Sequence, residues 1–153
     1  MVREFAFTLN GRPTTVRAEP TRSLLDVLRA TCGLKATRLG CGLGQCGACT
    51  VLAGDEAVRA CDTAIEAVAG RDITTVEGLG SPAAPHPLQA AFIEEQALQC
   101  GFCTSGMLMR SAALLKRHPH PTEAQIRQAL DDNLCRCGVH NRVVRAVQKA
   151  AAA

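Results

Sequence analysis

The chain has 153 residues, a formal net charge of +3, nine cysteines and no Trp or Tyr. The scattered basic residues and an aromatic content of 3% argue against a nucleic-acid-binding protein. The sequence contains no run of about 18 apolar residues, so we expect no membrane span. The first residues carry no secretory signal, which favours metal binding in the cytoplasm over a disulfide framework. Export together with a signal-bearing partner stays open.

The first half of the sequence predicts a small sheet with one helix. Apolar alternation on both sides of Asn10-Gly11 predicts a β-hairpin, and Gly54-Asp55 marks a second one. Ser23 is placed to cap a helix over residues 24–31. The predicted strands cover residues 3–9, 14–18, 50–53, 57–60 and 73–76.

The second half is helical in character and follows a segment rich in proline and glycine. Thr122 and Gln125 form a capping box, and Asn141 is placed to cap a last helix. The other two predicted helices cover residues 88–98 and 105–117. The predicted organisation is therefore α+β, with domains at 1–78 and 88–153 and a linker at 79–87.

A first cysteine set lies in and after a glycine-rich loop, with the spacing C-x4-C-x2-C-x11-C. Its members are Cys41, Cys46, Cys49 and Cys61. The first three follow the plant-type ferredoxin pattern, with a fourth cysteine downstream. Glycines at 40, 42, 44 and 47 allow close approach of the backbone, so that N–H groups point at sulfur. Buried free thiols are the alternative interpretation.

A second cysteine set has the spacing C-x2-C, then 31 residues, then C-x-C. Its members are Cys100, Cys103, Cys135 and Cys137. The first pair precedes a helix, whose N-terminal N–H groups favour thiolates. Taken alone, this set also fits a four-thiolate zinc site. Cys32 is left over and is interpreted as a small buried hydrophobe.

Both sets, in this order, resemble the small iron–sulfur subunit of the xanthine oxidase family of molybdenum hydroxylases. The resemblance covers nearly the whole chain. Its motifs are Leu39-GCGLGQCGACTV-Leu52 with Cys61, Gln99-CGFCTSGM-Leu108 and Asn133-LCRCG-Val139. It implies an N-terminal β-grasp ferredoxin domain and a C-terminal four-helix domain, each with one 2Fe–2S cluster bound by one cysteine set.

The resemblance also implies partners. A large catalytic subunit would carry the molybdenum–pterin cofactor, and Gln99 and Cys137 match positions that lie against the pterin in the family. The helical-domain cluster would lie nearer the molybdenum, and the ferredoxin-like cluster would pass electrons to a flavoprotein subunit or a cytochrome. Arg136, between two ligands, would raise the potential of its cluster; its alternative role is a surface ion pair.

One departure from the family pattern bears on the choice of subfamily. Ser105 stands where proline is common, and we expect it to cap the following helix. Together with residues 139–142 it favours hydroxylases of N-heterocycles such as isoquinoline or nicotinate, with aldehyde oxidoreductases as the alternative. A free-standing two-cluster ferredoxin and a zinc-stabilised interaction module are the competing functions. This chain carries no substrate site of its own in the family picture.

Overall fold

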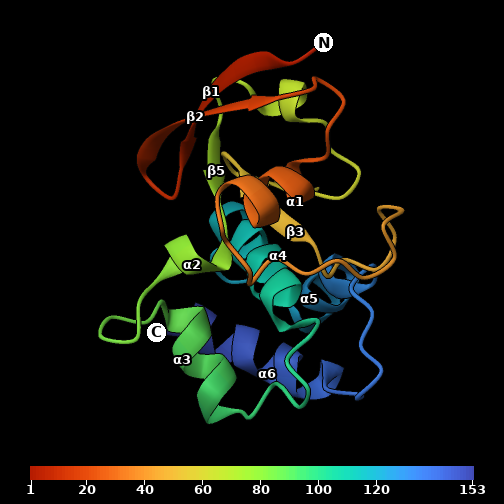
Figure 1. Cartoon of the computed structure of the whole chain (residues 1–153). Helices are drawn as coiled ribbons and strands as arrows, with labels where there is room; N and C mark the ends of the chain where they lie inside the picture. Colours follow the sequence, from red (N-terminus) through yellow and green to blue (C-terminus); the bar gives the residue numbers. More distant parts are fainter.

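The computed structural model describes all residues from Met1 to Ala153, and its first half forms a five-stranded sheet of order β2-β1-β5-β3-β4 (Figure 1). The strands are β1 (Arg3–Leu9), β2 (Arg12–Ala18), β3 (Thr50–Ala53), β4 (Glu56–Arg59) and β5 (Asp72–Thr74). β1–β2 and β3–β4 are antiparallel hairpins, as predicted, and β5 joins them, parallel to β1 and antiparallel to β3. The turn at Asn10-Gly11 has φ values of 51° and 77°, the conformation that this dipeptide favours.

One face of the sheet is covered by the predicted helix after Ser23. It consists of one α-helical turn, α1 (Leu24–Asp26), which continues as a π-helical segment, η1 (Val27–Thr31). The Ser23 hydroxyl accepts from the Asp26 N–H at 3.2 Å, which confirms the predicted cap. Leu24, Leu28 and the short 3-10 helix η2 (Ile65–Val68) complete a core of 16 buried residues against the inner side chains of the strands.

The second half is helical and has its own core of 19 buried residues. Its elements are α2 (Val76–Leu79), α3 (Pro87–Glu94), α4 (Thr104–Arg117), α5 (Glu123–Leu130) and α6 (His140–Ala151). The Thr122–Gln125 capping box is present at the start of α5. The α+β prediction, with a ferredoxin-like half and a helical half, is confirmed. No helix has the length and apolar character needed to cross a membrane.

The two halves pack together on the face of the sheet that α1 does not cover, where α4 contacts β3 (Figure 1). All of β3 is buried, because Val51 and Ala53 enter the core beneath α1 while Leu52 belongs to the core of the helical half. The chain between α2 and α3 spans residues 80–86, so the predicted linker boundaries at 79 and 87 each fall at a helix end.

Three local predictions are wrong. The helix predicted over 88–98 ends at Glu94, because Gln96 adopts a positive φ of 49° and turns the chain. Asn141 does not cap α6; Val139 is the N-cap, and the Asn141 side chain accepts from Arg127. Ser105 is not a cap either, since it is the second residue of α4.

Candidate metal centres

The first cysteine set surrounds a loop in which backbone N–H groups point at sulfur. The N–H groups of Leu43, Gln45 and Cys46 each lie 3.3 Å from the Cys41 sulfur. The Gly44 N–H lies 3.3 Å from the Cys61 sulfur. Positive φ values of 71° at Gly42 and 67° at Gly44 make these close approaches possible. The loop is therefore built to stabilise negative charge on sulfur.

The four thiols of this set differ in environment. Hydrogen bonds from the N–H groups of Leu43, Cys46 and Gln45 lower the pKa of the exposed Cys41 thiol to about 6. Burial raises the pKa of Cys49 to about 12. The structure thus places one thiol of this set at the surface and another inside the protein.

The second set joins the start of α4 to the turn between α5 and α6. Cys103 is the N-cap of α4, and burial raises the pKa of its thiol to about 12. Cys100 is exposed, and the Phe102 N–H lowers its pKa. Cys135 and Cys137 approach from the α5–α6 turn, in which Gly138 has a φ of 76°.

The sulfurs of both sets lie in pairs. Cys41 contacts Cys46, and Cys49 contacts Cys61, while Cys100 contacts Cys137, and Cys103 contacts Cys135. All nine cysteines are free thiols, and no three Cys, His, Asp or Glu side chains gather as ligands of a single ion. A 2Fe–2S cluster takes four thiolates, two on each iron. The two pairs of cysteines in each set fit the four thiolate ligands of one such cluster.

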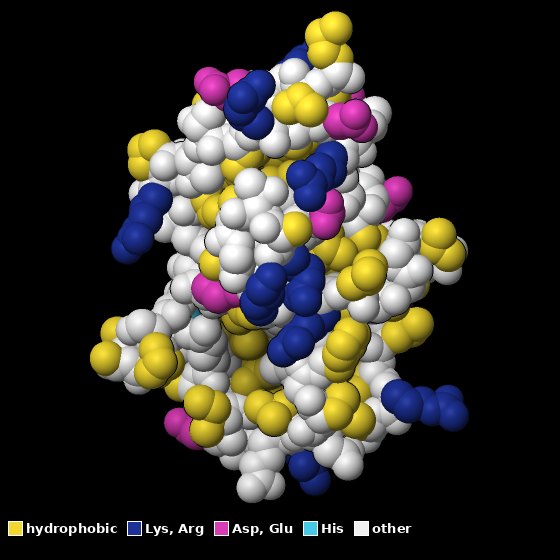
Figure 2. Space-filling model, in the orientation of Figure 1, with side chains coloured by type: hydrophobic (Ala, Val, Ile, Leu, Met, Phe, Trp, Pro, Cys, Tyr) yellow, Lys and Arg dark blue, Asp and Glu magenta, His cyan; other side chains and the backbone are white.

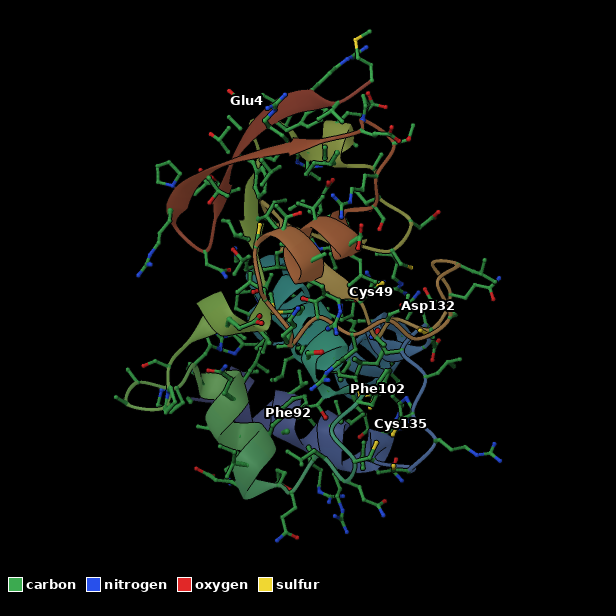
Figure 3. All side chains as sticks on the ribbon, in the orientation of Figure 1. Glu4, Cys49, Phe92, Phe102, Asp132 and Cys135 are labelled. Carbon is green, nitrogen blue, oxygen red and sulfur yellow. The ribbon has the colours of Figure 1, made fainter.

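The two sets are neighbours although they are far apart in sequence. The Leu134 N–H donates to the Cys46 carbonyl at 3.0 Å, and the Arg38 guanidinium lies 6.0 Å from the centre of the Phe102 ring. In Figure 3, Cys49 and Asp132 lie near the first loop, with Phe102 and Cys135 below them. A cavity of about 350 Å³ lies between the sets, lined by Gly40, Cys46, Ala48, Cys100, Phe102, Cys103, Leu134, Cys135 and Arg136.

The remaining predicted residues lie on the outer side of the second set or away from both. Gln99 is exposed beside the exposed Cys100, and Cys137 is half-buried. Arg136 is exposed. Cys32, predicted to be a small buried hydrophobe, is half-buried and packs against the core of the sheet half.

Two residues at the contact between the sets were not identified from the sequence. A Cβ on Gly106 would lie 2.1 Å from the Gly47 carbonyl oxygen, so α4 packs directly on the first loop there. Asn133 is 1% exposed and donates to the same oxygen. In the sequence, Asn133 is only a polar residue two positions before Cys135. That position alone does not predict its contact with Gly47, 86 residues away.

Comparisons with known proteins agree with this geometry. Residues 7–75 match a family model described as "2Fe-2S iron-sulfur cluster binding domain", and residues 75–148 match one described as "[2Fe-2S] binding domain". The nicotinate dehydrogenase of Pseudomonas putida has a subunit that is 52% identical over 151 residues, which cover 99% of this chain and 96% of that relative. The alpha subunit of isoquinoline 1-oxidoreductase of Brevundimonas diminuta is 51% identical over 146 residues, covering 95% of each chain.

A solved structure gives the same result at the level of the fold. Quinoline 2-oxidoreductase from Pseudomonas putida 86 contains a chain that superposes with a TM-score of 0.94 at 38% identity. The match covers 99% of this chain and 94% of that chain. The similarity therefore extends across both halves and the way they pack together.

Proposed function

The chain belongs to the xanthine oxidase family of molybdenum hydroxylases, as a small iron–sulfur subunit with two 2Fe–2S clusters. From this membership we propose a path for electrons through the chain. The chain receives electrons from the molybdenum–pterin centre of a large catalytic partner and passes them to an external acceptor. The observation that carries the proposal is the arrangement of eight cysteines as two adjacent sets of paired sulfurs. When bound, each cluster takes up and releases one electron at a time.

The chain's own residues hold the clusters and set their potentials. We assign Cys41, Cys46, Cys49 and Cys61 to the first cluster, and Cys100, Cys103, Cys135 and Cys137 to the second. The N–H groups around Cys41 stabilise negative charge on sulfur. The buried Cys49 and Cys103 exclude water from the inner side of each site.

The proposed direction of transfer runs from the second cluster to the first. In the family the helical-domain cluster lies nearer the molybdenum–pterin cofactor, with side chains at the positions of Gln99 and Cys137 against the pterin. The exposure of Gln99 and Cys100 supports this assignment, because a partner's cofactor can reach them without any rearrangement of the chain.

Exposed apolar side chains around both sites support docking of protein partners. Of the large hydrophobic side chains that are exposed, the ones near the cysteines are Leu39, Leu43, Leu98, Phe102 and Leu134. Figure 2 shows hydrophobic groups on the right-hand side of the molecule, where Figure 1 places the loops that carry the cysteines. Such clustering is typical of interaction surfaces. The large partner is proposed to dock on the second-site side, and the acceptor, a flavoprotein subunit or a cytochrome, on the first-site side.

The proposed substrate is an N-heterocycle, hydroxylated at carbon by the partner. Both relatives described above act, by their names, on nicotinate or isoquinoline, and the similar structure is a quinoline enzyme. An aldehyde is the alternative substrate. The proposed location is the cytoplasm, because none of the nine cysteines forms a disulfide and the cytoplasm keeps thiols reduced. Export with a signal-bearing partner is the alternative.

The test is reduction of the clusters by substrate in the purified complex. The complex with its molybdenum subunit is mixed anaerobically with nicotinate, quinoline, isoquinoline or an aldehyde, and the visible absorbance of the clusters is followed. We expect bleaching by an N-heterocycle, and no bleaching of the isolated iron-loaded chain, which is the control. Bleaching by aldehydes alone would contradict the substrate, and elution of the native chain alone near 16.1 kDa in size-exclusion chromatography would contradict the partner.

A further inference from the structure

The Gly47 carbonyl, in the first cysteine loop, accepts three hydrogen bonds. Two come from Thr50, whose N–H lies at 3.2 Å and whose hydroxyl lies at 2.7 Å. The third comes from the Asn133 side-chain amide at 3.2 Å. The Thr50 bonds are local and shape the loop itself. The Asn133 bond joins two loops 86 residues apart in the chain.

Asn133 is held rigidly from its own side. Its backbone N–H donates to the Leu130 carbonyl at 2.8 Å, and its carbonyl lies 2.7 Å from Nε2 of His140. A Cβ on Gly47 would lie 2.4 Å from the Asn133 amide nitrogen, so the amide packs directly on the glycine. The residue is 1% exposed, and its Oδ1 has no hydrogen-bond partner. A buried, half-satisfied amide costs free energy that an apolar side chain would not.

The neighbouring residue forms a second contact with the same loop. Leu134 donates its backbone N–H to the Cys46 carbonyl at 3.0 Å. Consecutive residues of the α5–α6 turn thus bind the carbonyls of consecutive residues, Cys46 and Gly47. Cys46 and Cys135, proposed ligands of different clusters, are thereby joined through one hydrogen bond and a short run of covalent bonds.

We propose that Asn133 is a positioning residue for electron transfer between the two clusters, which fixes the second cysteine loop on the first through the Gly47 carbonyl. The proposal rests on the cluster assignment of the proposed function. The amide aligns the turn so that the Leu134 N–H reaches Cys46, and electron transfer depends on that short connection. The ion pair of Asp132 with Arg59, at 3.6 Å and with Asp132 70% exposed, is too weak to fix the loops by itself.

The test uses the complete complex with Asn133→Ala and Asn133→Asp. The second variant keeps the shape of the side chain and removes the donor to Gly47. The measurements are iron content, the EPR signal of each reduced cluster, the low-temperature splitting caused by spin coupling between the clusters, and the rate of electron transfer between them. Asn141→Asp is the matched control, because Asn141 is exposed and contacts Arg127 instead of the loop.

We expect both variants to retain both cluster signals, with an altered splitting and a transfer rate lowered several-fold, because the spin coupling and the electron-transfer rate both fall as the distance and the path between the clusters lengthen. The control should match the unmodified complex. Unchanged splitting and rate in both variants would overturn the proposal, as would loss of a cluster from both, because Asn133 would then act in cluster binding. If only one variant loses a cluster, the splitting and the transfer rate of the other variant decide whether the proposal holds. Absence of two 2Fe–2S signals from the unmodified complex would instead contradict the proposed function.

Discussion

At the scale of single residues, the nine cysteines differ chiefly in the groups that face their sulfurs. Cys41 is exposed and surrounded by N–H groups, whereas Cys32 has no such donors and its pKa is raised by burial. Negative charge on sulfur is stabilised in the first environment and disfavoured in the second. This contrast separates Cys41 from Cys32, although burial also raises the pKa of the proposed ligands Cys49 and Cys103. The role of each cysteine can be tested one residue at a time.

We predict that Cys41→Ala or Cys49→Ala abolishes the EPR signal of the first cluster and leaves that of the second. Cys100→Ala or Cys135→Ala should do the reverse, since each removes one of the four thiolates that hold a cluster. The measurement is EPR of the dithionite-reduced complex, with iron content falling by half. Cys32→Ala is the control and should retain both signals. If substitution of any one of these four cysteines leaves both EPR signals intact, that cysteine is not a cluster ligand.

At the scale of elements, the contact between α4 and β3 joins the two halves of the chain. Leu52 is the one sheet residue in the core of the helical half, and it is 1% exposed. Gly106 lets the start of α4 approach the first cysteine loop at the same interface. The helix α4, whose N-cap is Cys103, is therefore positioned by the sheet strand that follows the first cysteine loop, which places the two cysteine sets side by side.

We predict that Leu52→Ala destabilises the helical half although the residue lies in the sheet. Truncation of a fully buried leucine costs about 2–5 kcal/mol, from lost transfer free energy and the cavity left behind. Chemical denaturation followed by circular dichroism measures the loss of free energy of unfolding. Ile93→Ala is the control, because Ile93 is 67% exposed on α3, and its effect should stay within about 0.5 kcal/mol. Equal effects of the two substitutions would contradict the shared core.

At the scale of the whole molecule, two small cores meet at one interface, and each half carries one cysteine set. Cores of 16 and 19 buried residues are small for a chain of 153 residues, and domains of that size commonly need a metal or another cross-link. The first cysteine set ties one loop to the segment around Cys61, and the second ties segments that lie farther apart, from Cys103 to Cys135. Cluster binding therefore contributes to the folding free energy.

We predict that the chain without iron is poorly folded. Chelation of iron under reducing conditions should lower the melting temperature and broaden the transition, because the ligand loops lose the bonds that hold them together. Differential scanning calorimetry of the chain before and after iron removal, and again after reconstitution, measures this change. A cooperative transition at the same temperature in the iron-free chain would show that the two cores suffice.

The sequence alone determined the α+β class, the hairpin at Asn10-Gly11, the Thr122 capping box and the two cysteine sets. These features depend on neighbours close along the chain, where turn preferences, side-chain period and ligand spacing act directly. It did not determine the end of α3, because the positive φ of Gln96 depends on how the chain must reach the second site. It also placed Ser105 and Asn141 as caps from residue type alone, whereas packing selected Cys103 and Val139.

Only the tertiary structure decided how the two cysteine sets lie relative to each other. The contacts of Asn133 with Gly47, of Leu134 with Cys46 and of α4 with β3 join segments tens of residues apart. No local pattern encodes such contacts, because they depend on which faces remain to be buried after the elements have formed. The spacing of cysteines therefore predicts two clusters, and the packing of the two halves makes the two cysteine sets neighbours.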